Sequence, residues 1–307
     1  MAAGVLVNLL IKIFILTIFG YFLKKWKIIT QELQEGLNNL LLKAILPVSV
    51  LMSSQNDYSI DAVNDMLITA VVALAYYMIA LIVTTLVSKR LSLSNSGKKV
   101  FITMSVFANV AFIGYPIMQE LYGNEGVLLA VVYNIFFQLI FFTYGISLLS
   151  GKKQMKLKML YTNPVVLASF ACVVLFIFQI KVPTGISSAL SSIGGMTVPV
   201  SMMLIGCSLA EVKVKEIMKD FYSYLVSAFR MILFPLAMIL VFYFIKVPAI
   251  VAGSCIVLTA LPAGSLNVIY AQQYNCEAGY ASKTVVQTMV IMIVTVPLMI
   301  ILVNLLL

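Results

Sequence analysis

The stretch "FANVAFIGYPIMQELYG", residues 107 to 123, decides the fold because it interrupts an otherwise almost continuous apolar chain. Asn109, Gly114 and Pro116 are poor residues for the middle of a lipid-embedded helix. Proline lacks the backbone donor and clashes with the preceding turn, glycine weakens a helix, and a buried amide needs a partner. We therefore predict that the helix containing this stretch is broken near the middle of the membrane.

The composition places the chain in a membrane. Of its 307 residues 62% are hydrophobic and 10% are charged, and the mean hydropathy is +1.08. Apolar runs recur along the whole chain at about the length of 20 residues that a helix needs to cross a bilayer, and the alternating segments of a barrel are absent. Residues 1 to 23 lack a basic cluster and a cleavage site, so we interpret them as a first span. The sequence predicts an all-α integral membrane protein.

The apolar runs predict ten transmembrane helices and leave no room for a soluble domain. The expected spans are residues 5–23, 37–54, 64–88, 99–120, 125–149, 163–180, 188–210, 222–244, 250–273 and 279–304.

The basic residues predict the orientation of these spans. Fifteen of them fall in or next to the loops on one side: Lys24, Lys25, Lys27, Lys89, Arg90, Lys98, Lys99, Lys152, Lys153, Lys156, Lys158, Lys213, Lys215, Lys219 and Lys283. Only Lys181 and Lys246 fall in loops on the other side. By the positive-inside rule the first set faces the cytoplasm, which places the protein in the cytoplasmic membrane with both termini outside. The net charge of +9 is then a topology signal, and no basic patch remains for a nucleic acid.

Residues for chemistry or metal binding are missing. The four cysteines are widely spaced and no histidine accompanies them, so we expect packing residues, no metal and no cofactor. No carboxylate lies deep inside a predicted span, and HExxH, GxSxG and Walker motifs are absent. We therefore expect that the protein is not an enzyme. Of the functions considered, transport driven by existing gradients is the one that remains.

An internal repeat relates the two halves of the chain. "LPVSVLM" at 46–52 and "VPVSMML" at 198–204 align at an offset of 152 residues. The same offset relates further pairs: Ala108 and Ala260, Ala111 and Ala263, Ile117 and Ile269, Tyr122 and Tyr274, Glu125 and Glu277. We predict a duplication into residues 1–150 and 151–307, which is inverted because each half holds five spans. Inverted repeats are typical of secondary transporters, although a duplicated scaffold without transport is an alternative.

The ninth span repeats the unusual composition of the fourth. It contains "LPAGSLN" at 261–267, with Pro262, Gly264 and Asn267. Two broken helices in inverted copies are expected to cross near the midplane and to direct positive half-helix N-termini at the crossing. Such N-termini would form an anion-binding site from backbone N–H groups. The alternative is that the two spans contain only ordinary proline kinks.

Two sets of residues are candidates for this site. For substrate binding we select Asn109, Gly114, Pro116, Pro262, Ala263, Gly264, Ser265 and Asn267. For a supporting polar cluster we select Lys43, Asn134, Gln138, Arg230 and Gln287. The asparagines either donate to a substrate carboxylate or bond between helices. Lys43 and Arg230 either extend to the interface or add positive potential to the approach.

Several ordered motifs resemble those of the auxin efflux carrier family, the PIN-like bacterial and plant permeases. They are "NVAFIGYPIMQELYGNEG", "NIFFQLIFFTYG", "TNPVVLA", "VPVSMMLIGCSLAEV", "FRMILFPL" and "LPAGSLNVIYAQQYNCEAG". The resemblance implies a scaffold domain of spans 1, 2, 6 and 7 that usually dimerises, and a transport domain of spans 3–5 and 8–10 that moves like an elevator. It also implies small organic anions as substrates, such as indole-3-acetate, malate or malonate.

The resemblance also assigns residues. It places Asn109 and Pro262 at the crossing and Lys43 and Gln138 in a supporting cluster. Plant carriers have a proline before the asparagine, where this chain has Ala108, so the break is expected to depend on Gly114 and Pro116 instead. Their long central loop is reduced to residues 150–162. Two other functions stay open: a sodium-coupled symporter of the bile-acid type, and a channel or receptor on the same fold.

Overall fold

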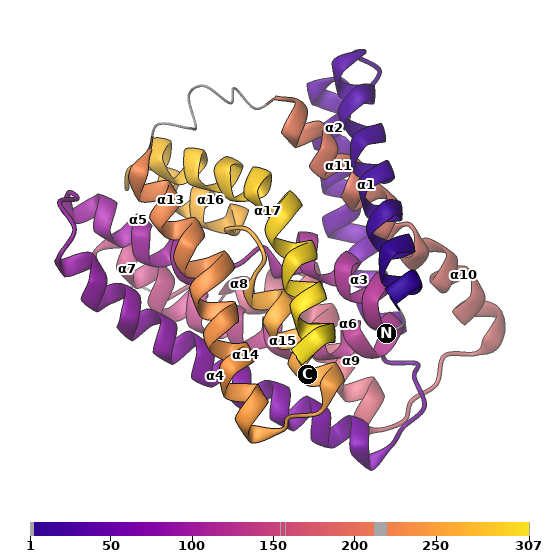
Figure 1. Ribbon diagram of the computed structural model, residues 1–307. Helices are drawn as coiled ribbons and strands as arrows, with labels where there is room; N and C mark the ends of the chain where they lie inside the picture. Colours follow the sequence, from indigo (N-terminus) through magenta and orange to yellow (C-terminus); the bar gives the residue numbers. More distant parts are fainter. Residues whose placement is uncertain (1–2, 154, 157, 212–219, 307) are drawn as a thin grey trace. The chain divides into compact units, whose positions relative to one another are not determined.

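The computed structural model describes residues 3–153, 155–156, 158–211 and 220–306, and Figure 1 shows them as helices joined by short connections. Within these ranges there is no strand, only one isolated β-bridge. Seven helical runs are long and apolar enough to span a membrane: Val7–Lys25, Gln31–Ser53, Ile60–Lys89, Val110–Ser150, Thr184–Ala210, Phe221–Ile245 and Ala278–Leu306. Pro164–Ile177 and Ala249–Thr259 are apolar but shorter. The all-helical membrane class is confirmed.

The described part of the chain differs from the ten predicted spans in how its helices are divided. The predicted fourth and fifth spans fall in one run, Val110–Ser150, which combines two helices across a kink at the non-helical Gly123 (φ +62°, ψ −147°). The predicted fourth span is itself divided, since its first half ends at Val106. The ninth is divided in the same way, with its first half ending at Thr259. Length and hydropathy therefore count seven runs among the described residues.

The chain forms two compact units. Unit 1 comprises Met1–Leu67, Ala111–Ile135 and Tyr161–Val212, and unit 2 comprises Ile68–Val110, Phe136–Leu160 and Lys213–Leu307. The helices of unit 1 are α1 (Ala3–Lys25), α2 (Gln31–Leu40), the π-helical turn η1 (Leu41–Ile45), α3 (Leu46–Ser53), α9 (Pro164–Ile177), α10 (Thr184–Gly195) and α11 (Thr197–Ala210). The chain passes between the units within α4 (Ile60–Lys89), the π-helical turn η2 (Val110–Gly114), α6 (Tyr115–Ile140) and α8 (Lys158–Thr162).

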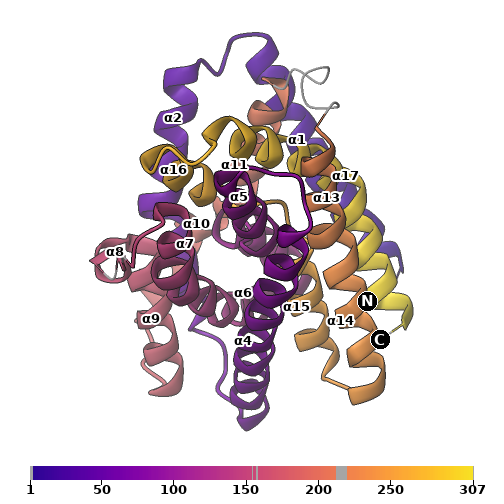
Figure 2. The same cartoon turned by 90° about the vertical axis from the view of Figure 1, so that its left-hand side faces the viewer.

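The remaining helices belong to unit 2. They are α5 (Asn95–Val106), η3 (Phe141–Gly145), α7 (Ile146–Ser150), α13 (Phe221–Ala228), η4 (Phe229–Leu233), α14 (Phe234–Ile245), α15 (Ala249–Thr259), α16 (Ser265–Gln273) and α17 (Ala278–Leu306). The α13–η4–α14 run packs along α17, as Figure 1 shows, and α15 packs on α14 and α17. In Figure 2, α16 lies beside α5, which it contacts.

In unit 1 the helices α1 and α11 pack closely because glycines face each other's backbone. A Cβ atom on Gly206 would lie 1.9 Å from the carbonyl oxygen of Thr17, and one on Gly20 would lie 2.1 Å from that of Met203. The Cys207 thiol donates to the Gly20 carbonyl at 3.3 Å. Close approach through small residues is how membrane helices associate without a hydrophobic driving force between them.

Side-chain caps fix the starts of several helices. Asn163 accepts a hydrogen bond from Val165 N at 2.9 Å, and Pro164 occupies the first helical position of α9. Ser94 accepts from Gly97 N at 2.9 Å at the start of α5, and Asp220 accepts from Tyr222 N at 3.1 Å at the start of α13. Such caps satisfy backbone donors that have no partner in the first turn.

Three of the π-helical turns end two residues before a proline. Ile45, Gly114 and Leu233 close η1, η2 and η4, and Pro47, Pro116 and Pro235 follow. A proline offers no N–H to the preceding turn, and a wider turn accommodates its ring without ending the helix. The prediction that Gly114 and Pro116 break their helix is therefore wrong: they lie in a continuous helical run.

The offset of 152 residues reappears in the backbone. Lys27 (φ +59°) and Gln179 (φ +53°) are left-handed residues 152 apart, and each follows the end of a helix, at Lys25 and Ile177 respectively. Gly123 (φ +62°) and Asn275 (φ +51°) are a second such pair. The side chains within each pair differ. The two halves of the chain therefore correspond at these positions in backbone conformation and not in residue type.

The predicted orientation rests partly on residues that the structure does not describe, since Lys213, Lys215 and Lys219 lie outside the described ranges. Among the described residues, Lys12, which the sequence places inside the first span, pairs with Glu120 at 2.7 Å. Lys24 pairs with Glu211 at 2.6 Å.

Candidate functional site

Both unusual stretches of sequence contain an interruption. Helix α5 ends at Val106, Phe107 is extended (φ −96°, ψ 105°), and helical structure resumes only at Val110. Helix α15 ends at Thr259, and the chain from 260 to 264 is non-helical before α16 begins at Ser265. In the first stretch the break precedes the predicted position by several residues.

The two interrupted segments pair with each other. Ala108 and Ala263 form an isolated antiparallel bridge. Asn109 N donates to the carbonyl oxygen of Pro262 at 3.0 Å, and Gly264 N donates to that of Phe107 at 2.9 Å. Backbone groups freed from two helices thus satisfy one another, which an apolar interior requires. We call residues 107–109 and 261–264 the crossing.

Gly264 is required by the space at the crossing. A Cβ atom there would lie 2.9 Å from the carbonyl oxygen of Ala108 and 3.2 Å from that of Phe107. Both neighbours are backbone atoms, so neither can move aside as a flexible side chain would. The "PAG" sequence at 262–264 therefore allows the close backbone approach.

Asn267 fastens the crossing. Its amide nitrogen donates to the carbonyl oxygens of Phe107 at 3.0 Å and Gly264 at 2.9 Å, and its side chain is completely buried. These two bonds use both amide hydrogens, so none is left for a ligand. Its Oδ1 atom has no hydrogen-bond partner within the described residues.

Asn109 makes weaker contacts. Its amide nitrogen donates to Ser265 Oγ at 3.4 Å, and 9% of the residue is exposed. Because only one long hydrogen bond is made, Asn109 retains a second amide hydrogen. Ser265 is the first residue of α16, so the pair lies at a half-helix N-terminus.

Arg230 is completely buried against the crossing. Its Nε donates to the Leu261 carbonyl at 2.6 Å, Nη1 to the Met104 carbonyl at 2.8 Å, and Nη2 to the Val106 carbonyl at 3.5 Å. Burial and these contacts exclude the alternative that this side chain extends to the membrane interface.

Thr288 is a residue at the crossing that sequence reasoning missed. Its hydroxyl accepts from Ala263 N at 3.1 Å and donates to the Val285 carbonyl at 2.8 Å. The adjacent Gln287, which was predicted, is 2% exposed, and within the described residues neither of its amide atoms has a partner. A threonine in an apolar helix gives no signal by itself that its partner is a distant backbone N–H.

An aromatic cluster covers one side of the crossing. Phe107 stacks on Tyr77 at 5.9 Å between ring centroids and meets Phe137 and Phe141 edge-on at 5.6 and 5.0 Å. The motif "NIFFQLIFFTYG" carries the signal, since Phe137 and Phe141 lie one helical turn apart. Gln138 in this motif is buried, and its Oε1 has no partner within the described residues.

The other predicted residues belong to unit 1. Gly114 and Pro116 lie in η2 and at the start of α6, and Lys43 is exposed in η1. Asn134 Nδ2 donates to the Tyr115 hydroxyl at 2.8 Å, which in turn lies 3.5 Å from Ser169 Oγ. Asn134 therefore serves a buried polar contact within unit 1.

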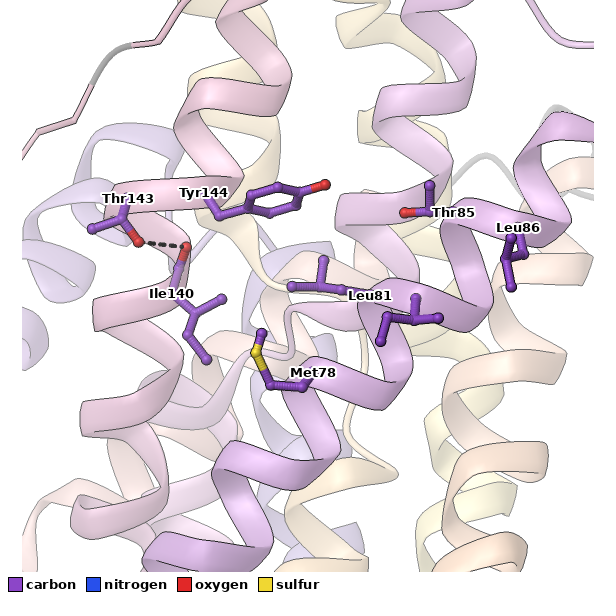
Figure 3. A pocket seen from close by; sticks show the side chains of 8 residues that line it. Met78, Leu81, Thr85, Leu86, Ile140, Thr143 and Tyr144 are labelled. Carbon is purple, nitrogen blue, oxygen red and sulfur yellow. Dashed lines mark hydrogen bonds between the residues drawn. The ribbon is translucent and has the colours of Figure 1, made fainter.

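A groove in unit 2 is lined by none of the site residues described above (Figure 3). It has a volume of about 460 Å³ and is lined by Met78, Leu81, Ile82, Thr85, Leu86, Ile140, Thr143 and Tyr144. Thr143 Oγ1 donates to carbonyls of its own helix, those of Leu139 at 2.6 Å and Ile140 at 3.3 Å. With no charged or amide group in its lining, the groove has little to bind an anion.

Within the described residues no group of His, Cys, Asp and Glu could hold a metal ion, and all four cysteines are free and buried. The chain is thus a multi-pass helical membrane protein with two interrupted helices joined at their breaks, a construction typical of transporters. It belongs to the family of membrane transport proteins, whose family model matches residues 5–160 and 152–300. This is the auxin efflux carrier family that the motifs predicted.

Curated relatives cover nearly the same length. An uncharacterized transporter of Methanocaldococcus jannaschii is 24% identical over 273 residues, 86% of this chain and 88% of the relative. One of Methanothermobacter thermautotrophicus is 23% identical over 295 residues, 94% of this chain and 95% of the relative. The uncharacterized transporter YfdV of Escherichia coli is 22% identical over 307 residues, 94% of this chain and 95% of the relative.

Proposed function

We propose that the protein is a gradient-driven carrier that moves a small organic anion, a mono- or dicarboxylate, across the cytoplasmic membrane by alternating access. The observation that carries the proposal is the buried guanidinium of Arg230 at the crossing. A charge in an apolar interior is costly unless it is compensated. Its carbonyl partners stabilise the guanidinium but carry no formal negative charge, and the sequence has no Asp or Glu from 66 to 119 or from 221 to 276. The crossing therefore holds a positive charge that would attract a substrate anion.

The N-terminus of α16 supplies the proposed binding groups. The first backbone N–H groups of a helix lack intrahelical partners, and the helix dipole places about half a positive charge there. Ser265 Oγ and the remaining amide hydrogen of Asn109 lie at this terminus. Pro262, Ala263 and Gly264 shape the backbone in front of it. Asn267 holds this arrangement, and Gln287 and Gln138 are supporting polar groups.

The transport mode is part of the proposal. The offset of 152 residues in both motifs and backbone supports a five-plus-five inverted repeat of ten helices. The predicted scaffold spans correspond to α1–α3 and α9–α11, which all lie in unit 1, and this supports a separate scaffold domain. In the proposed carrier the scaffold forms a homodimer, the remaining helices move in an elevator-like way, and both termini face outward. Lys43, Gly114, Pro116 and Asn134 stay proposed contributors on the basis of sequence.

Counterflow in proteoliposomes tests the function. Purified protein is assayed with a panel of labelled mono- and dicarboxylates, with and without unlabelled anion on the opposite side. A carrier shows trans-stimulated exchange, a channel shows none, and a sodium symporter fails when sodium is replaced.

The matched variants are Asn109→Ala and Asn39→Ala. Asn39 is an exposed asparagine in α2 that donates only to the Glu35 carbonyl, so its variant should exchange like the wild type. Asn109→Ala should lose about tenfold or more of exchange, as expected when a hydrogen bond to a charged ligand is removed. Full activity in Asn109→Ala would remove this residue from the site, and no exchange with any anion would refute the carrier.

A further inference from the structure

Arg230 lies where two half-helices end. Met104 and Val106 are in the last turn of α5, and Leu261 lies two residues beyond the end of α15. The last carbonyl groups of a helix have no intrahelical partner, and the dipole places about half a negative charge at that end. The carbonyl groups where both half-helices end are therefore directed at one cation. That cation is a side chain of the protein itself, the guanidinium of Arg230.

Carriers built on interrupted helices place ions at this kind of position. Their half-helix N-termini point at anionic substrate groups, while unwound carbonyls and half-helix C-termini coordinate the coupling cation. Here the guanidinium of Arg230 bonds to three carbonyl oxygens of that description, at 2.6, 2.8 and 3.5 Å. A free cation would compete for the same oxygen atoms.

We propose that Arg230 is a tethered replacement for a coupling cation, so that the crossing holds its shape and its positive charge without binding Na⁺. This inference rests on the proposed carrier function. An arginine suits the role because it stays protonated and presents five N–H donors in a planar fork. Its attachment to η4 also means that no binding step is needed in each cycle.

The local structure of η4 fits this role. Arg230 is the second residue of this π-helical turn, which ends two residues before Pro235. Single π-helical turns inside α-helices are frequent at functional sites. The Tyr76 hydroxyl also donates to the Val106 carbonyl, at 3.3 Å, so a second fixed donor supports the same carbonyl end.

Removal of the guanidinium and its replacement by free cations test the proposal. Full-length Arg230→Ala is compared with wild type and with Arg90→Ala, a control in which the exposed arginine at the end of α4 is removed. Thermal unfolding is measured without substrate in millimolar guanidinium chloride, in the same concentration of urea, and in sodium or N-methylglucamine chloride. Urea controls for denaturing effects because it has a similar shape and no charge.

The expected result is that Arg230→Ala unfolds at a lower temperature and that guanidinium or sodium, but not urea, raises its midpoint. Wild type and Arg90→Ala should respond to neither cation. In counterflow, Arg230→Ala should lose about tenfold or more of exchange, because three buried carbonyls lose their donors, and should regain part of it with guanidinium. A midpoint of Arg230→Ala that neither cation changes would overturn the proposal.

Two further measurements cover a variant that does not fold. Arg230→Lys keeps the charge but concentrates its donors on one nitrogen, so it should unfold between wild type and Arg230→Ala. Wild-type exchange should be equal in sodium and N-methylglucamine, and a sodium requirement would overturn the inference. Since the unfolding measurements need no substrate, a wild type that exchanges no carboxylate refutes the carrier and leaves the cation test standing.

Discussion

Gly264 donates its backbone N–H to the carbonyl oxygen of Phe107 at 2.9 Å, and the space where its side chain would lie is filled by the carbonyl oxygen of Ala108. The two broken helices are thus joined through a position that admits only hydrogen. The second backbone hydrogen bond of the crossing, from Asn109 N to the Pro262 carbonyl, joins the residues next to this contact. A change in spacing at Gly264 would therefore disturb both hydrogen bonds.

Gly264→Ala should therefore force the two segments apart. We expect a loss of about 1–3 kcal/mol in stability, the usual cost of overpacking a close contact. The measurement is the thermal unfolding midpoint of the purified protein in detergent. Gly185→Ala is the control, because a Cβ atom at Gly185 meets nothing within 4 Å. Equal midpoints for the two variants would show that the crossing has room for a side chain.

Asn267 and Asn109 should respond differently to the same substitution. Asn267→Ala removes the donor to two buried carbonyls, so we expect a loss of about 1–3 kcal/mol in stability, with the loss of transport following from it. Asn109→Ala should leave the unfolding midpoint nearly unchanged and reduce anion exchange. Thermal unfolding and counterflow on both variants check this contrast, and it fails if Asn109→Ala is the less stable of the two.

Sequence reasoning identified the two interrupted stretches correctly because glycine, proline and asparagine are conspicuous in apolar helices. It placed the first break at Gly114 and Pro116, whereas the structure has it at residues 107–109. The difference arises because a proline near the start of a helical segment is accommodated by a π-helical turn, as at Pro47 and Pro235. Such a turn depends on the preceding helix and cannot be read from the residues alone.

The partners of the crossing could not be predicted either. Arg230 was a candidate because a charge inside a span is rare, but its three carbonyl acceptors lie 31 or more residues away in the chain. Thr288 gave no signal, because its acceptor role depends on how α17 packs beside the crossing. Backbone acceptors and donors carry no residue identity, so only the fold shows which side chains they meet.

Thr288→Val should destabilise the crossing by leaving Ala263 N without its acceptor. The side chains have nearly the same shape, so the expected loss of about 1–3 kcal/mol reports the unsatisfied N–H group. Thr288→Ser should keep most of the stability. Thr295→Val is the matched control in the same helix, because its hydroxyl donates only to the Ile291 carbonyl one turn earlier. The measurement is the thermal unfolding midpoint of each variant. Equal decreases for Thr288→Val and Thr295→Val would argue against the hydrogen bond from Ala263 N to Thr288.

Gly206→Ala tests the packing of unit 1 in the same way. Its Cβ atom would lie 1.9 Å from the carbonyl oxygen of Thr17, so α1 must move away from α11 along the whole contact. We expect a loss of stability of about 1–3 kcal/mol or more, because a backbone atom cannot yield to the added methyl group. Gly36→Ala, whose Cβ atom meets nothing within 4 Å, should keep the wild-type midpoint or raise it, since alanine favours a helix over glycine. If Gly206→Ala unfolds at the same temperature as Gly36→Ala, the close approach of α1 and α11 is not what holds unit 1 together.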